Sequence, residues 1–162
     1  MVATMSLTRR ETIGSILLAG LAGCVGSGLD GGDEETPTPI EVGPSGGGVS
    51  LVRHHFEYPD AGPELFATLQ NTRDAGFELA DMECHVYEGD TLLAETFRTI
   101  SMDGNTTTEF SLGFNIGSKQ VDFQSSTRYT ITVDVPYENG VTDKIEKEFD
   151  QPVQFIETTS TE

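Results

Sequence analysis

The chain has 162 residues, with 9 Lys and Arg against 27 Asp and Glu, which gives a formal net charge of -18. So large an acidic excess argues against nucleic acid as a partner, because phosphate backbones are bound through clustered Lys and Arg. It argues equally against adsorption to an anionic lipid surface. The acids are spread along the chain, so they favour a strongly hydrated surface over the alternative of a cation-binding surface.

Residues 1–24 have the order of an export signal. Arg9 and Arg10 form a short basic region, residues 13–23 are apolar and Gly-rich, and small residues lead to Cys24. The apolar run is about half of the roughly twenty residues that a bilayer-spanning helix needs, so no permanent transmembrane segment is predicted. A buried core helix is the alternative, and the abrupt change to Gly, Asp and Pro after Cys24 disfavours it.

The stretch LTRRETIGSILLAGLAGC resembles a twin-arginine signal that ends in a lipobox, the pattern of prokaryotic lipoproteins. Leu21, Ala22 and Gly23 match the lipobox positions before Cys24, whereas Thr12 stands where twin-arginine signals usually have an aromatic residue. The Tat and Sec export routes therefore both stay open. The resemblance implies a diacylglyceryl-type lipid on the Cys24 thiol and a protein on the outer side of the cell membrane. With so acidic a mature part, the chain is similar to lipoproteins of halophilic archaea.

Residues 25–50 predict a disordered acidic linker. This stretch holds eight Gly, three Pro and five acids, with no basic residue. It contains too little apolar surface to offset the entropy lost on ordering, so a mobile tether is expected. Its DGGDEE run lacks the alternating acid spacing of an EF-hand loop, which disfavours a calcium site.

From residue 51 onward, apolar residues alternate with polar ones. The predicted inward positions are Val52, His54, Phe56 and Tyr58; Leu65, Ala67 and Leu69; Ala80, Met82, Cys84 and Val86; Phe110, Leu112, Phe114 and Ile116; Tyr129, Ile131, Val133 and Val135; and Ile145 and Phe149. Period two predicts strands with one solvated face. Residues 91–99 are also expected to be extended, with the inward face undecided. Turn signals PDAGP, EGD, MDGN and ENG separate the runs.

These runs predict an all-β domain over residues 51–157, with a short tail at 158–162. Seven strands in about 100 residues are typical of a two-sheet antiparallel Ig-like sandwich. Tyr129 begins the sixth strand, where such folds place a tyrosine whose hydroxyl fixes the preceding turn. The Cys–Trp–Cys core of antibody domains is absent, so the disulfide-free, fibronectin-III-like kind is expected.

The hairpin CHVYEGDTLLAETF, which follows LFATLQNT, resembles FxLYD-type and related Ig-like modules of prokaryotic surface lipoproteins. In those modules, a strand that carries an aromatic residue ends in a turn made of an acidic residue and a glycine. Cys84 stands where an apolar residue would be expected. The resemblance implies no catalytic residue, because these modules share none.

Histidines and Cys84 are the candidates for metal binding or catalysis. His54 and His55 are adjacent and should point to opposite faces of a strand, so a metal site of His55, His85 and a carboxylate is disfavoured. Met82 precedes Cys84 rather than following it, which excludes a blue-copper ligand order and leaves Cys84 as a small core residue. No nucleophile motif or phosphate loop is present, so we expect no enzyme, cofactor or metal site.

Asn105 opens the sequon Asn-Thr-Thr in a predicted turn, which makes it a candidate for N-glycosylation. Taken together, the sequence predicts a membrane-anchored extracytoplasmic lipoprotein that displays a non-enzymatic Ig-like interaction module to a protein or glycan partner. The alternative is a solute- or ion-binding lipoprotein that serves a transporter or a surface enzyme.

Overall fold

Strands dominate the part of the chain that the computed structural model describes, which is residues 37–43, 48–117, 119–137, 140 and 142–156. The predicted signal segment with Arg9, Arg10 and Cys24, most of the predicted linker and the tail at 158–162 lie outside these residues. Within the described residues, no helix has the length and apolar character needed to cross a membrane.

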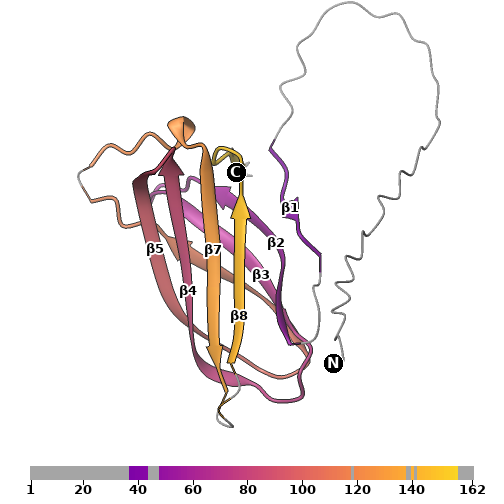
Figure 1. The fold of residues 1–162 in the computed structure, drawn as a ribbon. Helices are drawn as coiled ribbons and strands as arrows, with labels where there is room; N and C mark the ends of the chain where they lie inside the picture. The colour runs from indigo at the N-terminus through magenta and orange to yellow at the C-terminus, as the bar shows by residue number, and fades with distance from the viewer. Residues whose placement is uncertain (1–36, 44–47, 118, 138–139, 141, 157–162) are drawn as a thin grey trace, which may run out of the picture. The chain divides into compact units, whose positions relative to one another are not determined.

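Two sheets form the domain (Figure 1). The first holds β2 (Val49–Glu57), β3 (Glu64–Asn71) and β6 (Thr106–Gly113), and both β1 (Ile40–Glu41) and β9 (Phe155–Ile156) pair with β2. The second has the order β5 (Thr91–Met102), β4 (Phe77–Glu88), β7 (Arg128–Pro136) and β8 (Thr142–Phe149). The seven long strands confirm the predicted antiparallel, fibronectin-III-like sandwich. The two short strands were not predicted, and β9 pairs with β2 in parallel.

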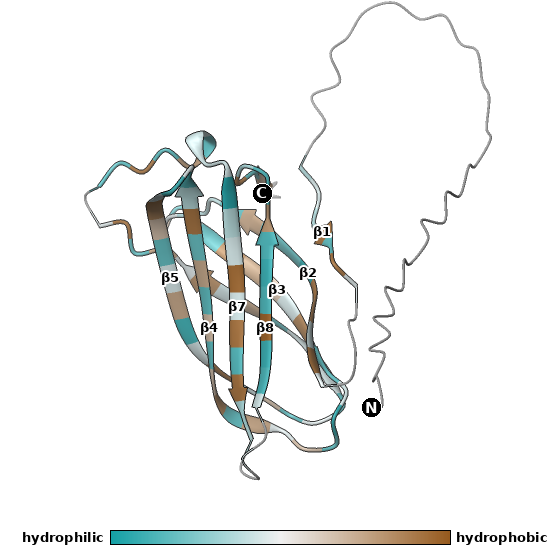
Figure 2. Cartoon of the chain, viewed as in Figure 1, coloured by the Kyte–Doolittle hydropathy of each residue, from teal (hydrophilic) through white to brown (hydrophobic). Residues whose placement is uncertain are grey.

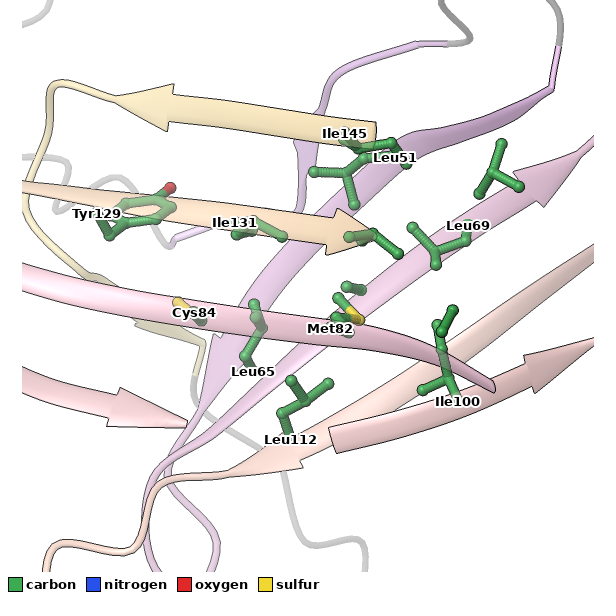
Figure 3. Close-up of a cluster of buried hydrophobic side chains, with 14 of the residues drawn as sticks. Leu51, Leu65, Leu69, Met82, Cys84, Ile100, Leu112, Tyr129, Ile131 and Ile145 are labelled. Carbon is green, nitrogen blue, oxygen red and sulfur yellow. The ribbon is translucent and has the colours of Figure 1, made fainter. Parts of the chain in front are cut away.

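The core lies between the two sheets and follows the predicted alternation. Leu65 and Leu69 from one sheet meet Met82, Cys84 and Ile131 from the other (Figure 3), and all five are fully buried. The bands of contrasting hydropathy along the strands in Figure 2 reflect the same period of two. On β5, which the sequence left undecided, the buried positions are Ala94, Thr96, Ile100 and Met102.

One predicted face on β2 is partly wrong. The ladder between β2 and β3 has an irregularity between Leu51 and Arg53, so that Val52 has no partner in the register. Such a bulge shifts the inward positions by one residue. Leu51 is therefore fully buried in the place predicted for Val52, while His54 and Phe56 keep their predicted inward positions. Tyr58, predicted inward, is 55% exposed.

The N-terminal boundary of the domain also lies earlier than predicted. Val49 and Ser50 already belong to β2, and Ile40–Glu41 forms a strand that pairs antiparallel with it. Within the predicted linker, residues 40–41 and 49–50 are thus built into the sheet. Ile40 packs against the core, which gives this short strand apolar burial to offset its ordering entropy.

Three of the four predicted turns, PDAGP, EGD and MDGN, connect strands as expected, and most of the fourth, ENG, lies outside the described residues. Gly89 adopts a φ of 55° in the tight β4–β5 turn, a conformation that glycine takes without steric cost. The longer connection from β6 to β7 contains a short 3-10 helix, Phe123–Ser125. Phe123 is buried there and packs its ring against Phe114 and Phe155, with centroids 5.4 and 5.5 Å away.

Candidate functional site

An open groove of about 1070 Å³ lies at the end of the sandwich where the β3–β4, β5–β6 and β7–β8 connections meet. This is the lower end in the view of Figure 1. Its lining combines apolar side chains with acids and one arginine: Arg73, Asp74, Phe77, Glu78, Leu79, Met102, Asp103, Pro136 and Tyr137 are among them. Connections of a rigid sandwich are the usual place for binding residues, because the sheets hold them in fixed positions.

Buried Asn71, the last residue of β3, holds two of these connections together. Its amide nitrogen donates to the carbonyl oxygens of Ala75 and Asp103, at 3.0 and 3.1 Å. Its side-chain oxygen accepts from the backbone N–H of Arg73 at 3.0 Å. A Cβ on Gly104 would overlap the backbone carbonyl of Asp74, so only glycine permits this close contact between the turns. The groove wall is therefore fixed in place without any ligand.

Arg73 is held against the opposite sheet. Its Nε and Nη2 atoms donate to the two carboxylate oxygens of Asp143, at 2.9 and 2.8 Å, and its guanidinium lies 5.0 Å from the centre of the Tyr137 ring. The Tyr137 hydroxyl also donates to Asp143, at 3.0 Å. The hydrogen bond from Arg73 keeps the pKa of Asp143 below its ordinary value, so this carboxylate is charged at neutral pH.

This pairing sets the charge of the groove. Arg73 is the only basic residue in the described lining, and its charge is matched by Asp143. Asp74, Glu78 and Asp103 are exposed around the same opening. Beside them Leu79 is 69% exposed, although most large apolar residues of this domain are buried. The groove therefore combines exposed acids with the exposed apolar side chain of Leu79.

A second polar group lies inside the sandwich. His54 on β2 and Tyr129 on β7 are both fully buried, and Nε2 of His54 lies 2.8 Å from the Tyr129 hydroxyl. Gln151 donates to the same hydroxyl at 3.1 Å, so the hydroxyl proton is free to be donated to His54. Burial lowers the pKa of His54 to about 4, with the charge of His55 as a smaller cause. His54 is therefore neutral in the folded protein.

Tyr129 itself only partly matches the prediction. It is the second residue of β7 and is buried as expected, and Phe149 stacks on its ring with centroids 5.0 Å apart. Its hydroxyl, however, bonds across the sandwich to His54 and to Gln151, instead of to the preceding turn. The turn is held by other groups, among them the backbone N–H of Thr127, which donates to the Tyr87 carbonyl at 2.8 Å.

A small cavity of about 190 Å³ lies next to this pair. Tyr129, Gln151, His55 and Phe56 line it together with Ile40 and the neighbouring residues 37 and 38. Pockets for organic ligands usually measure 300–1000 Å³, so this cavity has room only for a small solute.

The predicted metal candidates are kept apart by the fold. His55 lies on the outer side of β2, where its ring stacks on Phe66 with centroids 5.1 Å apart. His85 lies on β4 in the other sheet, 3.6 Å from Glu95. Within the described parts of the chain, no three His, Cys, Asp or Glu side chains come together as a metal-binding group.

Cys84 and Asn105 have well-defined surroundings. Cys84 is fully buried, and burial raises the pKa of its thiol, so this sulfur is neutral and shielded from solvent. Asn105 lies exposed in the β5–β6 turn with a φ of 54°, and its side-chain nitrogen donates to Asp74 at 2.8 Å. The sequon is thus presented at the rim of the groove, and its glycosylation stays a prediction.

Comparisons with known proteins leave the function open. No family model matches the sequence, and no curated protein matches it. Among solved structures, a β-glucuronidase from glycoside hydrolase family 2 aligns at 13% identity and a TM-score of 0.37, over 64% of this chain and 11% of that chain. A GH2 β-galacturonidase from Eisenbergiella tayi, bound to galacturonate, aligns at 19% identity and the same TM-score of 0.37, over 64% of this chain and 19% of that chain. Likeness this distant says nothing about activity in this protein.

The groove was not found from the sequence. Its parts come from three connections that are far apart along the chain, and Arg73 lies 70 positions before Asp143. The one available signal was the alternation itself: Leu79 is an apolar residue at a position that Ala80 to Val86 make outward-facing.

Proposed function

We propose that this protein is a membrane-anchored extracytoplasmic lipoprotein whose Ig-like domain is a non-enzymatic interaction module. The lipid anchor on Cys24 rests on the lipobox resemblance. The interaction surface is the groove between the β3–β4, β5–β6 and β7–β8 connections, and its occupant is a basic segment of a partner protein that inserts an apolar side chain.

The observation that carries this proposal is the charge arrangement of the groove. Asp74, Glu78 and Asp103 line the groove together with exposed Leu79, and the only arginine in the described lining is matched by Asp143. Acids beside an exposed apolar side chain complement Lys or Arg next to an aliphatic or aromatic residue. Such an anchor, buried at the centre of an interface and surrounded by charges, is the usual arrangement of a binding hot spot.

Site-specific photo-crosslinking on intact cells tests the groove. A photoreactive amino acid replaces Leu79 in one protein and Tyr58, exposed at the other end of the sandwich, in the control. We expect a discrete crosslinked product at position 79 that disappears when Asp74→Lys and Glu78→Lys are added, and no such product at position 58. Products at both positions, or a product at 79 that survives the charge reversal, would overturn the groove as the specific surface.

The alternative function, binding of a solute or ion, is favoured by the cavity of about 190 Å³ beside Tyr129 and Gln151. Its polar groups could hold a small neutral or cationic solute. The cavity takes second place because it is smaller than ordinary ligand pockets, whereas the groove of about 1070 Å³ offers a surface of the size that a peptide segment needs.

A further inference from the structure

Three of the four outer sheet edges are protected against pairing with another chain. The outer edge of β2 is occupied by β1 and β9. The edge of β6 faces side chains from β5: Thr96 donates to the carbonyl of Gly113 and Arg98 to that of Ser111, both at 2.8 Å. The edge strand β8 has the sequence TDKIEKEF, in which five of eight residues are charged. Charged side chains and covering segments are the usual means of preventing edge-to-edge association.

Strand β5 is the least protected of the four edges, because only its own Thr96 and Arg98 side chains reach from it to β6. It has 12 residues, TLLAETFRTISM, of which only Glu95 and Arg98 are charged. It pairs with β4 on one side, and no further strand of the described chain pairs with its outer edge. On the outward face Phe97 is 78% exposed, and Leu92 near the start of the strand is 45% exposed. A long, apolar, unpaired edge is a template for the addition of another strand.

The charges beside Phe97 favour a basic segment as the added strand. Glu83 of β4 is its direct partner in the register, and Glu95 lies two residues away on the same face of β5. His85 bridges these two carboxylates, at 4.0 Å from Glu83 and 3.6 Å from Glu95. A second copy of this chain would bring another Glu95 and a further net charge of -18 to the same edge. A basic segment would meet attraction instead.

We propose that the outer edge of β5 binds an extended segment of a partner protein as an added strand, with an apolar side chain on Phe97 and a flanking Lys or Arg facing Glu95. Glu83 of β4, behind Phe97, adds to the negative charge of this face. Backbone hydrogen bonds to the edge supply the affinity, and the alternating side chains supply the selectivity. This surface differs from the groove, so either can fail while the other stands.

A designed probe peptide of sequence Thr-Lys-Thr-Ile-Thr-Lys-Thr, acetylated and amidated, tests this edge on the full chain. We expect saturable chemical-shift changes of the β5 amides in NMR titrations, and added hydrogen-exchange protection that is confined to β5. Phe97→Ala and Glu95→Lys should each weaken binding at least fivefold. Tyr58→Ala and Glu146→Lys, which change an exposed aromatic residue and an acid elsewhere, should leave binding unchanged.

Two control peptides separate strand addition from simple charge attraction. A peptide with Glu in place of both Lys should not bind, and a peptide with alternate backbone amides methylated should lose binding while it keeps its charge. If the methylated peptide binds equally well, or if the signals move outside β5, the proposal is wrong. Absence of binding by the Lys peptide, or concentration-dependent self-association through β5 instead, would also overturn it. Groove variants Asp74→Lys and Glu78→Lys should not affect this measurement.

Discussion

The hydroxyl of Tyr129 on one sheet lies 2.8 Å from Nε2 of His54 on the other, and both residues are fully buried. This contact is a polar tie through the middle of an otherwise apolar core. Nδ1 of His54 is also buried and has no hydrogen-bond partner among the described residues. Protonation of the ring would therefore place an uncompensated charge between the sheets, which makes His54 the most acid-sensitive part of the core.

The first prediction concerns this histidine. The pKa of His54 is about 4 in the folded protein against 6.5 for an ordinary histidine, so between these pH values the unfolded chain binds the additional proton. The contribution of neutral His54 to the free energy of unfolding is fully present above pH 6.5. It is lost as the pH falls toward 4, by about 3 kcal/mol in all. Urea unfolding measured from pH 7 to pH 4 should show a shallower decline for His54→Phe than for the parent protein. Equal slopes for the two proteins would contradict the assignment.

The second prediction concerns Tyr129. Tyr129→Phe should keep the stacking on Phe149 but leave buried His54 without its partner, which should lower the free energy of unfolding by about 1–2 kcal/mol. Chemical denaturation at pH 7 measures this loss. Tyr87→Phe is the matched control and should have little effect, because the Tyr87 ring lies beneath Arg128, outside the core. Unchanged stability of Tyr129→Phe would show that the tie contributes nothing.

The third prediction concerns the groove wall. Asn71→Ala removes three hydrogen bonds and leaves backbone groups of two connections unpaired, so we expect a loss of about 2–3 kcal/mol in unfolding free energy. Faster hydrogen exchange in both turns should accompany it. Asn115→Ala in the β6–β7 connection is the control, because that asparagine is exposed and lies outside the groove lining. A loss of stability without any change in the exchange of the turns would argue against this role.

The fourth prediction follows from the charge of the chain. Repulsion among carboxylates should be screened as the Debye length falls from about 10 Å at 0.1 M salt to about 3 Å at 1 M, so the melting temperature should rise with NaCl. Differential scanning fluorimetry measures this rise. Neutralising Glu83 and Glu95 together, which lie side by side on the outer face of the β5–β4 pair, should make the dependence shallower. A melting temperature that does not respond to NaCl would contradict the charge argument.

The fifth prediction concerns the anchor. Cys24→Ser removes the thiol that the lipobox resemblance assigns to lipid attachment, so the variant should leave the membrane fraction and appear in the soluble or secreted fraction. Cell fractionation with immunoblotting detects this change, and mass spectrometry of the mature N-terminus identifies the lipid. Cys84→Ala serves as the control, because that thiol is buried in the core and should not affect membrane attachment.

The fold could be predicted from the sequence because the period-two pattern is nearly unbroken. Leu65 to Leu69, Ala80 to Val86 and Tyr129 to Val135 all keep their predicted faces. The exceptions were Val52 and Tyr58. A bulge depends on how two strands pair and leaves no mark in the hydropathy of one strand, and β2 ends at Glu57, before Tyr58. The short strand at Ile40–Glu41 was hidden for a related reason: two residues in a Gly- and Pro-rich stretch carry no periodic signal.

The candidate site could not be predicted in the same way. Asn71 reads as the polar end of a strand, and its burial arises only when the β5–β6 turn folds over it. Arg73 and Asp143 are ordinary charged residues until the two sheets bring them together. Such sites depend on contacts between residues far apart in the chain, so the sequence of one segment does not show which residue its side chains will contact.

The pairing of Ile40–Glu41 with Arg53–His54 has a mechanical consequence. Tension applied to the chain from its N-terminal side would load this two-residue ladder before any long strand. Rupture there would remove Ile40 from the wall of the cavity beside Tyr129 and would open the edge of β2, while the seven long strands stayed folded. Under tension, β1 would therefore detach from β2 first, and the sandwich of long strands would unfold only at a higher force.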